Sequence, residues 1–147
     1  MTRRASLSTL TRMRGSTLDH GLLLTRLGMG VMFMLHGWPK ISGGVATWAK
    51  LGGAMRHVGV TFGPPEMWGF LGALSEFGGG LLVALGLLFS PACGALVATM
   101  FVATMMHLGS GDSVMSASHA IEAGVVFLGL ALTGPGRFAL GGRLMPR

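Results

Sequence analysis

Residues 77–106, FGGGLLVALGLLFSPACGALVATMFVATMM, contain no charged residue and no histidine. These 30 residues exceed the ~20 that one membrane-spanning helix needs, and FSP lies near the middle. Ser90 and Pro91 are typical of a helix start, as N-cap and first helical residue. We therefore predict two membrane-spanning helices joined by a tight turn.

The rest of the 147-residue chain has the composition of a membrane protein. Half of it is hydrophobic, the mean hydropathy is +0.64, and only 11% is charged, against ~25% in a typical soluble domain. Tyr, Asn and Gln are absent, so buried polar chemistry must come from other residue types and the backbone. The single cysteine, Cys93, excludes an internal disulfide, a C-x-x-C redox pair and a thiolate metal cluster.

Proline and glycine signals divide the chain into four predicted spans. They cover about residues 19–38, 66–89, 91–108 and 117–133. Pro39 follows the first span and Gly134 follows the last, and both residues disfavour continuation of a helix. In the long connection 40–65, Trp48, Leu51, Met55 and Val58 recur at helical spacing, as in a short interfacial helix. The predicted fold is all-α, a transmembrane four-helix bundle with an interfacial helix between its first two spans.

Basic residues predict the orientation. Residues 19–140 form one membrane domain, flanked by basic tails at 1–18 and 141–147, and the first tail is expected to be poorly ordered. Outside the spans, the side of the termini carries seven arginines and the opposite side three basic residues. The positive-inside rule then places both termini in the cytoplasm. We read the net charge of +6 as this orientation signal, not as nucleic-acid binding.

Ionisable residues inside the spans predict a site. An ionised group at bilayer depth costs from ~3 to over ~10 kcal/mol unless it is paired or wetted. At ~1.5 Å per residue, Arg26 and Glu76 differ in depth by about one turn, so we expect an Arg26–Glu76 ion pair near mid-membrane. The remaining polar residues gather in the outer half of the bundle: His36, Lys40, His107, His119 and Glu122.

Each of these elements also has a purely structural interpretation. Arg26 with Glu76, and His107 with Glu122, could be staples between helices, while His36 bonds a loop carbonyl and His119 is solvated. No metal site is predicted, because a di-iron centre needs two Glu-x-x-His motifs and two further Glu. A haem with two His ligands needs them at equal depth on facing helices, and only His36 and His107 could meet that condition, so haem is disfavoured. No flavin or nucleotide motif is present.

The order of these residues resembles the DoxX family of small bacterial membrane proteins, over about residues 22–140. The motifs are Arg26-x3-Gly30-x2-Phe33-x2-His36-Gly37-x2-Lys40, Glu76-x2-Gly79-Gly80, His107, Glu122 and Gly134-Pro-Gly-Arg-Phe-Ala-Leu140. In that family the ending usually continues with Ser-Leu-Asp, whereas this chain has Ala139-Leu140-Gly141. Related proteins include the membrane subunit of thiosulfate:quinone oxidoreductase and membrane partners of soluble enzymes in thiol oxidative stress.

The resemblance implies an inner-membrane protein engaged in redox work, often with quinone. A quinone needs hydrogen-bond donors at its carbonyls and a proton route, and electrons would come from a partner protein or a small reductant. The candidate catalytic residues are His36, Glu76, His107 and Glu122, and the candidate quinone-binding residues are Arg26, His36, Lys40, His107 and His119. The alternatives are a non-enzymatic scaffold for a soluble redox enzyme, and a small-molecule carrier. Homo-oligomers through glycine-rich helix faces are also expected.

Overall fold

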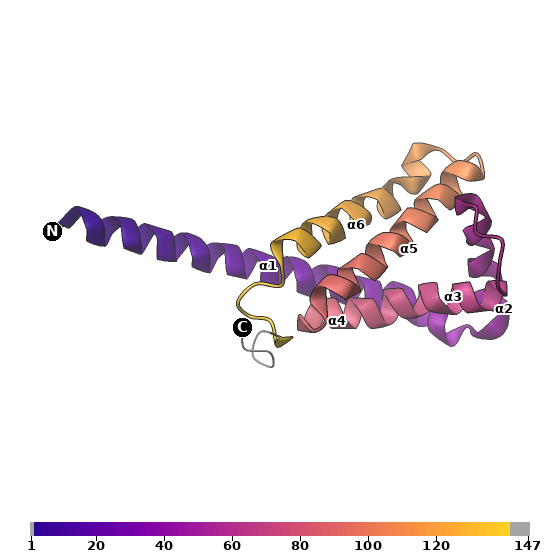
Figure 1. Cartoon of the computed structure of the whole chain (residues 1–147), viewed down its shortest axis with the longest axis horizontal. Coiled ribbons are helices and arrows are strands. Elements are labelled where there is room, and N and C mark those ends of the chain that lie inside the picture. The colour runs from indigo at the N-terminus through magenta and orange to yellow at the C-terminus, as the bar shows by residue number, and fades with distance from the viewer. Residues whose placement is uncertain (1, 142–147) are drawn as a thin grey trace.

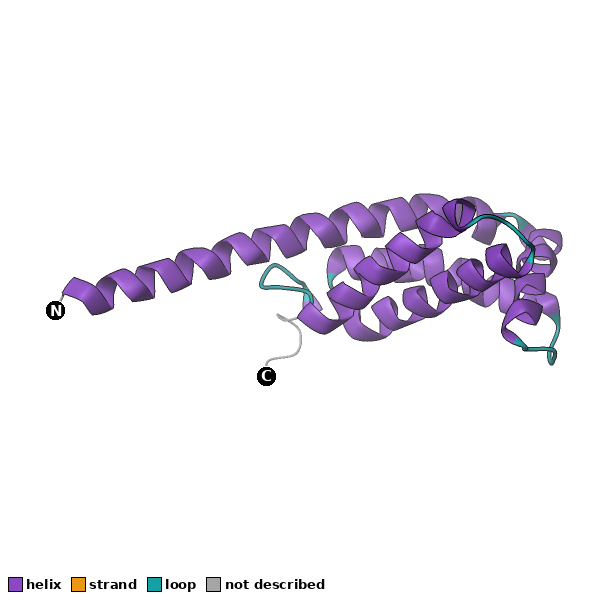
Figure 2. Ribbon diagram, turned by 90° about the horizontal axis from the view of Figure 1, so that it is seen from above, coloured by secondary structure: helices purple, strands orange, loops and turns teal. Residues whose placement is uncertain are grey.

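The computed structural model describes residues 2–141 and contains helices but no strand within that range (Figure 2). Four helical segments are long and apolar enough to cross a membrane, at Gly15–Ser42, Pro65–Leu85, Phe89–Gly109 and Val114–Thr133. The predicted all-α four-helix membrane fold is therefore confirmed. The elements in chain order are α1 (Thr2–Ser42), α2 (Gly44–Gly52), η1 (Gly53–Val58), α3 (Pro65–Leu74), η2 (Ser75–Gly79), α4 (Gly80–Leu85), α5 (Phe89–Gly109) and α6 (Val114–Thr133).

The bundle consists of two helix groups that meet at one end and diverge at the other (Figure 1). The first half of the second span, α3, packs beside α1 together with η2 and α4, and α5 packs on α6. At the diverging end, η1 bridges to α5 and α2 packs on α3. We call this the capped end, and the opposite end, where segment 134–141 lies, the terminal end. The core between the groups centres on Val83, Cys93, Leu96 and Phe127.

The first helix is longer than predicted at both ends. It begins at Thr2, so residues 2–18, expected to be a poorly ordered tail, are helical and extend beyond the bundle (Figure 1). It also passes through Pro39 to Ser42. Proline removes one backbone donor, but the following turn is held by other contacts, since the Trp48 indole N–H donates to the Lys40 carbonyl at 3.0 Å. The predicted tail at 142–147 lies outside the described residues.

The second span contains one π-helical turn, η2, between α3 and α4. Such turns are rare in proteins, and those that occur often lie at functional sites. The span ends at Leu85 instead of Phe89, because Gly86 adopts the left-handed conformation with φ 70° that terminates helices. The third span begins at Phe89, so Ser90 lies inside the helix and the predicted N-cap is wrong. The predicted tight turn between these spans is confirmed.

Close backbone contacts fix the arrangement of α1, α2 and α3. A Cβ at Gly37 would lie 2.4 Å from the Phe77 amide nitrogen, so α1 sits directly on the π-helical turn. A Cβ at Gly69 would lie 1.8 Å from the Trp48 carbonyl oxygen, which places α2 directly on α3. The helix predicted between the first two spans is therefore present, and it covers the space between the diverging helices.

Candidate functional site

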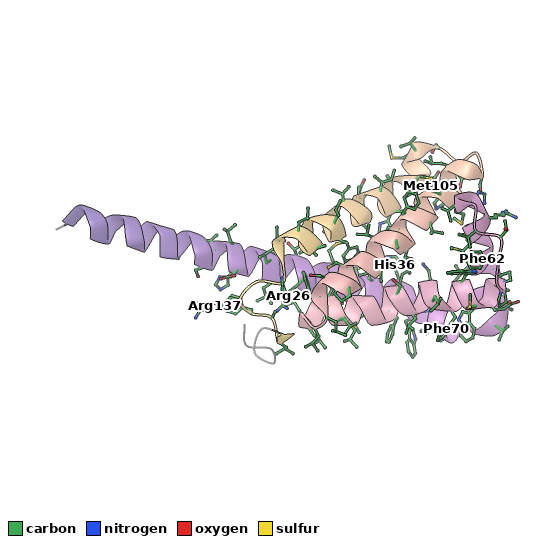
Figure 3. All side chains as sticks on the ribbon, in the orientation of Figure 1. Arg26, His36, Phe62, Phe70, Met105 and Arg137 are labelled. Carbon is green, nitrogen blue, oxygen red and sulfur yellow. The ribbon has the colours of Figure 1, made fainter. Side chains whose placement is uncertain are left out.

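A cavity of about 590 Å³ lies at the capped end, between the two helix groups and beneath α2 and η1. Its volume falls within the ~300–1,000 Å³ typical of small-molecule sites. Most of its wall is apolar. Five of the predicted polar residues line it: His36 and Lys40 from α1, Glu76 from η2, His107 from α5 and His119 from α6. Figure 3 labels His36, one of these lining residues.

An ion pair between Lys40 and Glu76 forms the polar wall of this cavity. The Lys40 ammonium donates to both carboxylate oxygens of Glu76, at 2.7 and 2.5 Å. The Glu76 side chain is 7% exposed and that of Lys40 is 34% exposed. Because α1 continues past Pro39, Lys40 lies on the same face as Gly37 and reaches the π-helical turn. The pair compensates the buried carboxylate and leaves part of the ammonium facing the cavity.

The predicted Arg26–Glu76 pair is wrong. Lys40 follows Arg26 by 14 residues, about 21 Å along a helix, so Arg26 lies far from Glu76 at the terminal end (Figure 3). There the buried Arg26 guanidinium donates through Nη2 to the Phe138 carbonyl at 2.6 Å. The prediction failed because depths were counted from assumed helix ends, and α1 extends four residues past Trp38. Arg26 does not line the cavity, so the structure does not place it with the other predicted quinone-binding residues.

Two histidine rings lie next to each other in the lining of the cavity. The ring centroids of His36 and His119 are 5.3 Å apart, and Phe33 contacts both rings. No group of three or more His, Cys, Asp or Glu side chains in metal-binding geometry occurs among residues 2–141. The pair therefore adds two imidazoles, each able to donate or accept a hydrogen bond, to the cavity that Lys40 and Glu76 also line.

Of the predicted residues His107 and Glu122, only His107 lines the cavity. Its Nδ1 pairs with Asp112 at 2.8 Å, so the alternative structural interpretation, in which His107 pairs with Glu122, is wrong. Asp112 also donates its backbone N–H to the His107 carbonyl at 3.0 Å, which closes the α5–α6 loop on the histidine. Glu122 is exposed and lies outside the cavity lining. The α6 helix begins three residues before the predicted Ala117, at Val114 capped by Ser113, which sets Glu122 deeper in the span than expected.

Small residues of α3 and α5 line the cavity, with Gly72 on α3 and Ala95 and Ala98 on α5. α3 and α5 have almost no direct contact with each other. The Thr99 hydroxyl of α5 donates to the Ser75 hydroxyl of η2 at 3.0 Å and links the second and third spans. Ser75 and Thr99 are lining residues that sequence reasoning missed, since an isolated hydroxyl in an apolar helix gives no pattern.

The fold and the cavity define a class: a small four-helix integral membrane protein with a polar site in one half of its bundle. The DoxX family model matches residues 21–108, which is more than half of the chain. The chain is also 33% identical over 127 residues to Inner membrane protein YqjF of Escherichia coli (strain K12), covering 83% of this chain and 90% of that protein. This chain belongs to the DoxX family. No solved structure matches it.

Proposed function

We propose that this protein binds quinone, or a similar lipophilic redox molecule, in the cavity at the capped end. The observation that carries the proposal is that the Lys40–Glu76 ion pair and the imidazoles of His36 and His119 line one otherwise apolar cavity. A quinone headgroup has two carbonyl acceptors on opposite sides of an apolar ring. In this proposal the Lys40 ammonium donates to one carbonyl and an imidazole N–H of His36 or His119 donates to the other.

The apolar lining supports a ligand that arrives from the bilayer. A quinone carries a long apolar tail that partitions into lipid, so its headgroup must enter a protein sideways. In this proposal it enters between α3 and α5, which have almost no direct contact and contribute the small residues Gly72, Ala95 and Ala98 to the cavity lining.

Reduction of a bound quinone to quinol consumes two electrons and two protons. In this proposal the electrons come from a partner protein or a small reductant. Lys40 holds one carbonyl, and Glu76 and the imidazoles of His36 and His119 pass protons to the quinone oxygens. His107, held by Asp112 at the cavity edge, links the site to the loop between α5 and α6. Glu122 lies outside the cavity and takes no part in this route.

The proposal includes a location and an orientation. The similar E. coli protein is named an inner membrane protein, and we place this chain in the same membrane of its own cell. With both termini in the cytoplasm, the capped end faces outward. The exposed basic residues there, Lys50 and Arg56, then offer a surface to a soluble redox partner. This arrangement follows the positive-inside rule.

Quinone binding is tested on purified protein in nanodiscs. The melting temperature is measured with and without a short-chain benzoquinone or naphthoquinone, and lipophilic molecules that co-purify are identified by mass spectrometry. We expect quinone to raise the melting temperature of the wild type and of Lys50→Met, a control at an exposed lysine outside the cavity. Glu76→Gln should lose most of this shift. A wild type that retains no quinone and shows no shift would refute the proposal.

A further inference from the structure

Glu122 is a carboxylate without a partner on the outer surface of a membrane-spanning helix. It is exposed, and it makes no hydrogen bond or ion pair with any described residue. It follows the start of α6 by eight residues and precedes its end by eleven, or about 12 and 16 Å. It therefore lies near the middle of the span, where no headgroup or water layer solvates it, and bare exposure to lipid is costly.

The residues around Glu122 form a regular stripe. Successive spacings of four, three, four and three residues give the 3.5-residue period of parallel helix pairs. Val125 and Leu132 in this stripe are 65% and 81% exposed, so this face of α6 is not used within the chain. The buried residues of α6, such as Ala120 and Phe127, lie on its opposite side. We name this surface the α6 stripe; its members are Ser118, Glu122, Val125, Gly129 and Leu132.

The stripe is complementary to itself. In a parallel helix pair with this period, each Glu122 lies next to Ser118 of the partner subunit. Ser118 is half-buried, and its hydroxyl has no hydrogen bond among the described residues, so it is free to donate. Gly129 is exposed with open space around it, which allows close backbone approach. By contrast, Gly30 and Gly37 of the predicted glycine-rich faces are already packed within the chain.

We propose that the α6 stripe is the interface of a parallel homodimer, in which the Glu122 carboxyl accepts a hydrogen bond from Ser118 of the partner subunit. A two-fold axis along the membrane normal repeats this bond on both sides. No residue of the α6 stripe lines the cavity, so this interface does not depend on the quinone proposal.

The dimer is tested by single-molecule photobleaching of labelled protein diluted into lipid bilayers. We expect the wild type to be dimeric, and Glu122→Leu and Gly129→Leu to weaken association at least about tenfold, because they remove the interhelical bonds or the close approach. Gly129→Leu creates no clash within one chain. Gly94→Leu on α5, equally exposed and open, is the matched control and should leave the dimer intact.

Three outcomes would overturn the proposal. The wild type could be monomeric over the whole dilution series, in which case another membrane protein or lipid covers the stripe. Glu122→Leu and Gly129→Leu could associate as strongly as the wild type. Gly94→Leu could abolish the dimer, which would place the interface on α5. Circular dichroism and melting temperature of each variant confirm that the fold is retained, and an unchanged quinone-induced shift in Gly129→Leu separates this test from that of the cavity.

Discussion

Replacement of Lys40 with methionine tests whether the Lys40–Glu76 pair holds the capped end together. Methionine keeps an unbranched side chain of similar length and removes the charge. The substitution leaves the Glu76 carboxylate, whose side chain is 7% exposed, without the donor that contacts both of its oxygens. Removal of one partner of a buried ion pair costs ~3–5 kcal/mol. Since the Lys40 side chain is 34% exposed, we expect the lower end of that range, about 3 kcal/mol.

The measurement is the free energy of unfolding from SDS titration in mixed micelles, followed by far-ultraviolet circular dichroism. Lys50→Met is the matched control, because Lys50 is exposed on α2 and should change stability by less than about 0.5 kcal/mol. A double variant, Lys40→Met with Glu76→Gln, replaces the unpaired charge with a neutral amide. It should recover about 2 kcal/mol relative to Lys40→Met alone.

Two results would refute this reasoning. Lys40→Met could cost no more than Lys50→Met, which would mean that water or another group satisfies Glu76. The effects of Lys40→Met and Glu76→Gln could also be additive within about 0.5 kcal/mol, which would show that the two side chains do not interact.

Three further substitutions test the packing and the corrected position of Arg26. Gly37→Ala should destabilise the protein by about 1–3 kcal/mol, because its Cβ would lie 2.4 Å from backbone of the π-helical turn, whereas Gly28→Ala, with open space around it, should be neutral or stabilising in the same titration. Arg26→Met should change the unfolding free energy by less than about 1.5 kcal/mol, since the lost bond to Phe138 is offset by removal of two buried nitrogens, Nε and Nη1, that have no hydrogen-bond partner; a loss of 3 kcal/mol or more would contradict this. Gly109→Ala should raise the hydrogen exchange of η1, because the new Cβ would lie 2.4 Å from Nδ1 of His57 in η1 and displace that ring; unchanged exchange would argue against that contact.

Much of the fold could be predicted because hydropathy sums over many residues. An uncharged run such as 77–106 needs two helices whatever its details, and Gly134-Pro-Gly ends the last helix at Thr133 as predicted. Helix ends were less predictable. Pro39 is a strong local stop signal, yet tertiary contacts carry α1 past it, and Ser90 is a good N-cap that the chain does not use.

The residues that gather in the candidate site could be predicted from the sequence, but their hydrogen-bond and ion-pair partners could not. The sequence indicated that polar residues gather in one half of the bundle, and the cavity unites His36, Lys40, Glu76, His107 and His119. Their bonds depend on helix rotation and on axial offsets of a single turn. The partner predicted for Arg26, and the one that the structural interpretation gave His107, were therefore wrong, and these residues bond to the chain near Phe138 and to Asp112 instead.

Composition and local order along the chain are enough to identify a four-helix membrane protein of the DoxX type with ionisable groups concentrated toward one end, because burial in lipid enforces these properties residue by residue. The packing of the helices was needed to show that Lys40, and not Arg26, compensates Glu76, and that Glu122 faces outward. An ion pair requires two atoms within about 3 Å, and that distance depends on how helices pack on one another.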